Sequence, residues 1–179
     1  FPYTTLFRSV EKGQPEVPVY DVEQLLAQAA AVGVTGIIDC GCELPNLMTA
    51  IQMAVDHPDS VHAAIAIHPN EAVLHGHRGV PGPDGLSLKY KPHHDVSFDD
   101  ALAEVHRLAL AYPYQVVAIG ETGMDLFRTG EGAKELQRDA FREHIALAKE
   151  LNLPMQIHDR DSHREVIETL LADGSPERT

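Results

Sequence analysis

The segment VVAIGETGMD, Val116 to Asp125, decides how the rest of the chain is interpreted. Its first half is an apolar run that ends at Gly120, as is typical of a buried strand. Glu121 then stands between two glycines, and Asp125 follows one turn later. We therefore expect a strand over residues 115–120 that brings carboxylates to its carboxyl end.

Short apolar runs alternate with helical patterns on both sides of this segment. Further strands are expected over residues 36–40, 61–67 and 154–158, and helices over residues 22–33, 45–58, 98–113, 134–151 and 163–172. Asp21 is a suitable N-cap for the first helix, and Gly33 a suitable stop. Apolar strands that are each followed by a helix predict parallel pairing through right-handed crossovers.

Two folds fit this order, an open doubly wound sheet and a (β/α) barrel. Three successive strands are followed by a polar side chain: His68, Glu121 and His158. Barrel enzymes build their sites from such strand ends, and the glycine-rich phosphate motifs GxGxxG and GxxxxGK[ST] do not occur. We predict an α/β fold, a partial (β/α)8 TIM-type barrel. Because about four strands are recognisable where a closed barrel has about eight, the first strand and the C-terminal strands are expected to be missing.

Composition narrows the class of protein. The chain has 179 residues, 44% of them hydrophobic and 23% charged, as is typical of globular proteins. A net charge of −13 argues against a basic nucleic-acid footprint, and no apolar run reaches the length of a membrane helix. Cys40 and Cys42 are too close in a strand to pair easily, so a disulfide framework is not expected. Two unpaired cysteines are compatible with a reducing, cytoplasmic setting.

Both ends of the chain are unusual. FPYTTLFRS, residues 1–9, lacks the features of a signal peptide and resembles translated sequencing adaptor. Residues 10–179 are interpreted as the N-terminal part of one barrel domain with a loop excursion over residues 72–96, and the chain is expected to be truncated at both ends.

Histidine and glutamate brought to one rim by different strands are ligands for zinc, manganese or magnesium. Two such ions can activate water and stabilise a leaving oxygen, as phosphodiester hydrolysis requires. Taken alone, Glu121 is equally explained as a solvated loop acid, and His158 as a hydrogen-bonded histidine at a strand end. Their repetition at equivalent strand ends favours a shared function.

Three motifs in order, AIAIHPNEA, VVAIGETGMD and FREHIALAKELNLPMQIHDRD, resemble the TatD family of metal-dependent deoxyribonucleases, which are amidohydrolase-like barrels. By this resemblance Glu121 is a metal ligand placed to bridge two ions, and His158 is a second ligand. His68 lies beside the substrate, Asp125 supports the site, and Arg160 grips a phosphate oxygen or holds a carboxylate. The cofactor implied is a pair of divalent ions (Mg, Mn or Zn).

The resemblance implies a hydrolase of phosphodiester bonds with DNA ends as its substrate, most simply a 3′-end exonuclease, without a membrane partner and with oligomeric state unknown. The family's His-x-His pair does not occur before Asp21, and its later histidine and aspartate would lie beyond Thr179. We therefore expect this chain itself to be weak or inactive. The alternatives are another amidohydrolase-like barrel hydrolase, acting on a small ester, lactone or amide, and a non-catalytic fragment.

Two further features have simpler interpretations. His75, His77, His93 and His94 in the excursion could bind metal, but a mobile, solvated insertion is the preferred interpretation because nothing in the sequence fixes their geometry. The Cys-Gly-Cys at residues 40–42 is weak evidence for metal and fits small buried thiols equally well.

Overall fold

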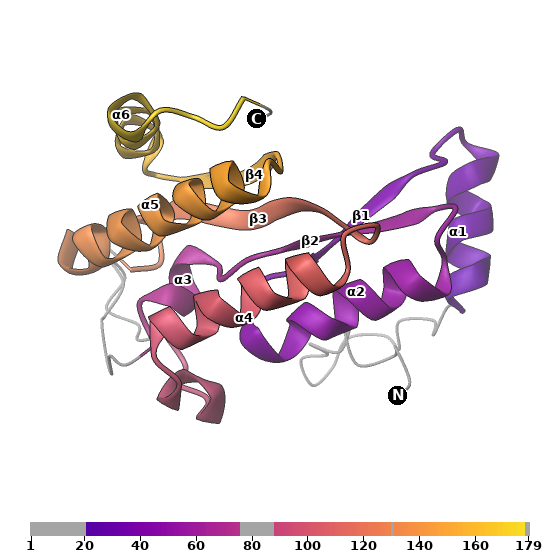
Figure 1. Ribbon diagram of the computed structural model, residues 1–179, viewed down its shortest axis with the longest axis horizontal. Coiled ribbons are helices and arrows are strands. Elements are labelled where there is room, and N and C mark those ends of the chain that lie inside the picture. The colour runs from indigo at the N-terminus through magenta and orange to yellow at the C-terminus, as the bar shows by residue number, and fades with distance from the viewer. Residues whose placement is uncertain (1–20, 76–87, 130, 178–179) are drawn as a thin grey trace, which may run out of the picture. The chain divides into compact units, whose positions relative to one another are not determined.

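The computed structural model describes residues 21–75, 88–129 and 131–177 (Figure 1). The chain divides into two compact units, Phe1–Thr35 and Gly36–Thr179. The described part of the first unit is helix α1 (Val22–Ala31). It follows Asp21, and the chain leaves it through Gly33, whose φ of +89° suits a residue without a side chain. The expected adaptor, residues 1–9, lies outside the described residues.

The second unit alternates strands with helices, as the sequence predicts. In chain order its elements are β1 (Ile37–Gly41), η2 (Leu44–Asn46), α2 (Leu47–Asp56), β2 (Val61–Ile65), α3 (Pro69–Ala72), η3 (Pro92–Asp95), α4 (Phe98–Ala111), β3 (Val116–Asp125), η4 (Glu131–Ala133), α5 (Lys134–Leu151), β4 (Met155–Arg160) and α6 (His163–Asp173). Among the described residues no helix combines the length and apolar character needed to cross a bilayer.

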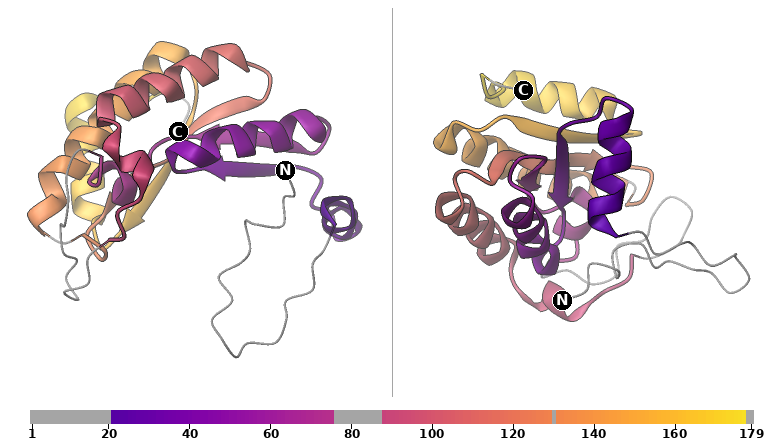
Figure 2. Two further views of the ribbon diagram at one scale, coloured as in Figure 1. Left: turned by 90° about the horizontal axis from the view of Figure 1, so that it is seen from below. Right: turned by 90° about the vertical axis from the view of Figure 1, so that its right-hand side faces the viewer.

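The four strands form one parallel sheet in the order β1-β2-β3-β4. Each strand pairs with the next along the chain, so the order never reverses as it does in a doubly wound sheet. This consecutive order is that of a (β/α) barrel, and the predicted barrel-type α/β fold is confirmed. Helix α2 packs against β1 and β2, and α5 packs against β3 (Figure 2).

Strand β3 is longer than the sequence indicated, and this matters for the site. The predicted end at Gly120 is wrong, because the strand continues to Asp125. Gly120 pairs with Gln156 and Thr122 with Ile157, so Glu121 is an extra residue in a bulge. A bulge redirects a side chain without ending the strand. Close approach to β4 also requires Gly123, since a Cβ there would lie 2.1 Å from the His158 carbonyl oxygen.

The excursion also differs from the prediction. Helix α3 and the short helix η3 lie at its two ends, and His75 and His94 are buried, with 2% and 0% of their surface exposed. The predicted solvated position is therefore wrong for His75 and His94. The His75 ring donates to the Val96 carbonyl at 2.8 Å, and His94 lies 2.7 Å from Glu71 of α3. His77 lies outside the described residues.

Candidate metal centre

Three strands bring His68, Glu121 and His158 together at the carboxyl end of the sheet. His68 follows β2, Glu121 is the bulge residue of β3, and His158 lies in the second half of β4. One ligand atom from each side chain lies within 4.8 Å of those of the other two. The expectation that these polar residues share one rim is confirmed.

His158 is held between two carboxylates. Its Nδ1 lies 2.9 Å from Glu121 Oε1, and its Nε2 lies 3.1 Å from Asp125 Oδ2. A carboxylate oxygen accepts hydrogen bonds, so each ring nitrogen is placed to donate to a carboxylate on its own side. The pair of contacts fixes the orientation of the ring.

Asp125 is the best-anchored acid of the group, with 1% of its surface exposed. Its Oδ1 accepts the Arg128 backbone N–H at 2.9 Å, and its Oδ2 accepts the Asn70 side-chain amide at 3.0 Å. Burial pushes the pKa of Asp125 upward, but these hydrogen bonds and the one from His158 outweigh it, so the pKa falls below its usual value. Asp125 is thus a carboxylate at neutral pH.

His68 has a different hydrogen-bond pattern. Its Nδ1 accepts the Asn70 backbone N–H at 3.2 Å, as the N-cap of α3. Burial, followed by the neighbouring His158, lowers the pKa of His68, which favours the neutral ring. In that ring Nε2 carries the proton, so it is a donor rather than a metal ligand. Its ring meets that of His158 edge-on, with centroids 4.4 Å apart.

The donor chemistry fits a divalent ion at Glu121 and His158. Their contact joins a carboxylate oxygen to an imidazole nitrogen, and a metal replaces the shared proton in such pairs. The other nitrogen of His158 would still donate to Asp125, as metal-bound histidines commonly do to a carboxylate. Asn70 Oδ1 is a buried acceptor without a partner in the described part of the chain, so a further polar group is accommodated there.

A second group of potential ligands, Glu71, His93 and His94, lies in the excursion. Glu71 Oε2 is 3.1 Å from His93 Nε2 and 2.7 Å from His94 Nε2. However, His94 Nδ1 accepts the Lys91 backbone N–H at 2.9 Å, so the neutral ring carries its proton on Nε2 and donates it to Glu71. Hydrogen bonds thus account for this group, and they lower the pKa of Glu71 against the opposing effect of burial.

Two buried side chains that support the rim were not singled out from the sequence. Gln137 on α5 accepts the Asp125 N–H at 2.7 Å and donates to the Asp125 carbonyl at 3.1 Å. Its side-chain amide thus makes the two backbone hydrogen bonds that a neighbouring strand would make. His144 Nε2 accepts the N–H of Ile67 at 3.1 Å, one residue before His68. The local sequence does not indicate the role of either residue, because each is a single polar residue in an amphipathic helix.

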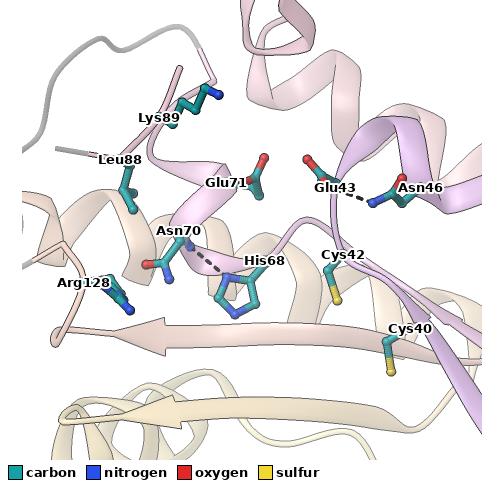
Figure 3. A pocket seen from close by; sticks show the side chains of 10 residues that line it. All are labelled: Cys40, Cys42, Glu43, Asn46, His68, Asn70, Glu71, Leu88, Lys89 and Arg128. Carbon is teal, nitrogen blue, oxygen red and sulfur yellow. Dashed lines mark hydrogen bonds between the residues drawn. The ribbon is translucent and has the colours of Figure 1, made fainter. Parts of the chain in front are cut away.

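An open pocket of about 430 Å³ lies beside His68. Figure 3 shows Asn70 and Arg128 to the left of His68, and Glu71 and Glu43 above it. The expected contact of Arg160 with a carboxylate is not found among the described residues, and its expected contact with a phosphate oxygen stays a prediction. Its guanidinium lies over the Phe127 ring, 3.9 Å from the centroid.

Comparison with known proteins gives a consistent picture. The family model described as "TatD related DNase" matches residues 16–178. An uncharacterized metal-dependent hydrolase TatD of Mycobacterium tuberculosis is 35% identical over 160 residues, covering 87% of this chain and 51% of the relative. A 3′-5′ ssDNA/RNA exonuclease TatD of Yersinia pseudotuberculosis is 30% identical over 151 residues, covering 84% and 48%.

A solved structure shares the fold. The crystal structure of YJJV, a TatD homolog from Escherichia coli, matches with a TM-score of 0.66 and 27% identity, covering 87% of this chain and 51% of that one. The chain therefore spans about half the length of the curated relatives and solved structures that it matches.

Proposed function

This chain belongs to the TatD-related DNase family, and from that premise we propose that it hydrolyses phosphodiester bonds in nucleic acid with the help of divalent metal ions. We propose further that it removes nucleotides from the 3′ end of a single strand and that two ions take part. The first point is supported by the similarity to the 3′-5′ ssDNA/RNA exonuclease TatD of Yersinia pseudotuberculosis. The second is supported by the resemblance on which Glu121 is placed to bridge two ions.

The observation that carries the proposal is that the His158 ring is hydrogen-bonded to Glu121 through one nitrogen and to Asp125 through the other. Imidazole between two carboxylates is the arrangement of a metal-binding histidine with its supporting acid. Glu121 and His158 would hold the ion, and Asp125 would keep His158 in the correct orientation and tautomer. A bound divalent ion supplies Lewis-acid polarisation of the phosphoryl group and activation of water.

The other residues of the rim act on the substrate in this proposal. His68 presents its Nε2–H, because Nδ1 is occupied by the Asn70 N–H, and an N–H donor suits a phosphate oxygen. The net charge of −13 opposes extended contact with a duplex. It is compatible with a strand end bound at a small site, where bound cations reverse the local field.

Cleavage of short labelled strands tests the proposal. The chain is incubated with 5′-labelled single-stranded DNA or RNA and with Mg²⁺, Mn²⁺, Zn²⁺ or EDTA. Because the sequence predicts weak activity for this chain, the assay uses a high protein concentration and long incubation. We expect slow, metal-dependent shortening from the 3′ end, lost in Glu121→Gln and His158→Asn. Glu135→Gln is the matched control, because Glu135 is an exposed acid paired with Arg138 on α5.

Two results would contradict the proposal. One is hydrolysis of a small ester or lactone that depends on Glu121, with no cleavage of either strand under any metal; the site would then belong to another hydrolase of the same barrel type. The other is strand cleavage that Glu121→Gln and His158→Asn retain in full, because the activity would then come from elsewhere.

A further inference from the structure

The arginines of the described residues fall into two groups. Four of the six pair with carboxylates: Arg107 with Glu104, Arg138 with Glu135, Arg142 with Asp173 and Arg164 with Glu168. Arg128 and Arg160 have no carboxylate partner among the described residues. In a chain with 27 acidic residues and 14 lysines and arginines, two unpaired guanidinium groups are unexpected.

These two arginines share one aromatic ring. The guanidinium carbon of Arg160 lies 3.9 Å from the centroid of the Phe127 ring, and that of Arg128 lies 5.4 Å from it. All three side chains are exposed. A ring face holds a guanidinium in place without using its N–H groups. The contact therefore orients two like charges near each other and leaves their donors available for an anion.

The backbone fixes this cluster beside the candidate metal centre. The Arg128 N–H donates to Asp125 Oδ1 at 2.9 Å, and the Arg160 carbonyl accepts the Leu126 N–H at 2.9 Å. The Arg128 side chain also lines the pocket that holds His68 (Figure 3). An anion at the two arginines would thus lie next to the rim where Glu121 and His158 meet.

Most acids near the cluster are already engaged. Glu71 accepts hydrogen bonds from the histidines of η3, and Glu43 pairs with Lys91. Asp159, next to Arg160, bonds to Ser162 and His163. Asp161 also flanks Arg160 and has no partner among the described residues; it follows β4 at a φ of +54°. Three of these four carboxylates are therefore already engaged, which leaves the guanidinium donors open to an external anion.

We propose that Phe127, Arg128 and Arg160 form a binding site for a backbone phosphate of a single-stranded nucleic acid, one that is not itself cleaved. The inference rests on the proposed function and deepens it. Guanidinium groups bind phosphate oxygens through paired N–H donors, and a stacked guanidinium keeps its donors in a fixed plane. Phe127 is the positioning residue: it orients Arg160 by stacking and makes no polar contact with the strand.

The experiment measures binding without cleavage. Fluorescence anisotropy follows 5′-fluorescein-labelled dT8 as the full chain is added in EDTA, at several salt concentrations. We expect Arg128→Gln and Arg160→Gln each to raise Kd roughly tenfold. Each should also reduce the slope of log K against log salt by about 0.7, the value for one lost contact with a single strand. Arg107→Gln, which removes an exposed, ion-paired arginine on α4, should change neither.

The positioning role of Phe127 is tested separately. Phe127→Leu should raise Kd and lower the salt slope while thermal melting is unchanged, and Phe127→Tyr should restore both values. A merely structural role would move the melting curve and leave the slope of a folded variant as in the wild type.

Several outcomes would overturn the inference. These are wild-type binding of dT8 by both arginine variants, no binding of dT8 by the wild-type chain, or binding of dTMP or inorganic phosphate as tightly as dT8. The last would identify a site for a free phosphate ester. Because EDTA removes metal, loss of the proposed function appears only in the cleavage assay with Glu121→Gln, so the two failures are distinguishable.

Discussion

Acidification should destabilise this fold through His144, the buried histidine that holds the strand end before His68. Its Nε2 accepts the Ile67 N–H and its Nδ1–H donates to the Ala140 carbonyl at 2.7 Å, so the ring is neutral and both nitrogens are occupied. Burial lowers the pKa of His144 from 6.5 to about 4. Between these two values the unfolded chain binds a proton that the folded chain does not, so stability falls as pH falls.

The size of the effect follows from the two pKa values. With 6.5 for the unfolded chain and about 4 for the folded one, the free energy of unfolding should fall by about 2 kcal/mol between pH 7 and pH 5. Urea unfolding followed by circular dichroism measures it in the wild type and in His144→Gln, whose amide can still accept the Ile67 N–H. Other groups titrate in this range, so the difference between the two proteins isolates His144.

We expect His144→Gln to lose about 2 kcal/mol less than the wild type over that pH interval. Equal pH dependence in the two proteins, with unchanged denaturant slopes, would refute the reasoning. It would mean that the ring is solvated or already charged in the folded state.

Three further predictions concern the rim. Gly123→Ala should lower the free energy of unfolding by about 2–4 kcal/mol, because the added Cβ would overlap the His158 carbonyl oxygen. Gly36→Ala is the control, because a Cβ there has open space, and urea unfolding compares the two variants. Gln137→Leu should cost about 1–3 kcal/mol in the same measurement, because the backbone N–H of Asp125 loses its partner, while the Asp125 carbonyl keeps its hydrogen bond from the Thr129 hydroxyl. A loss under about 1 kcal/mol would contradict this. Burial raises the pKa of Cys42 from 9.0 to about 11, so at pH 8 its alkylation by iodoacetamide should be roughly a hundredfold slower than in urea; comparable rates would count against its burial.

Much of the architecture could be predicted because it depends on local pattern. The predicted helix over residues 134–151 has those bounds in the structure, since its apolar face repeats at helical spacing over many turns. The parallel order follows from strands that each precede a helix. Both cysteines are free thiols, as their spacing indicated.

The contacts of the site were less predictable because they depend on register between distant segments. The bulge at Glu121 exists only relative to its partner strand β4, so the sequence of β3 alone suggested an end at Gly120. The burial of His94 depends on Glu71, 23 residues earlier, and a polar loop composition carries no sign of that contact. Glu121 and His158 were found because each stands next to an apolar run. Phe127 and Arg128 were not, because neither residue type is distinctive in a loop.

The central claim is that Glu121 and His158 hold a divalent ion at the carboxyl end of the sheet. Calorimetric titration with Mn²⁺ at pH 7 tests it directly, in the wild type, Glu121→Gln, His158→Asn and the control Glu135→Gln. We predict saturable binding in the wild type and control, weakened at least tenfold in the other two. Proton release should accompany binding, because the proton between His158 Nδ1 and Glu121 Oε1 must leave. Equal Mn²⁺ affinity in all four proteins, or no binding in any, would contradict the account.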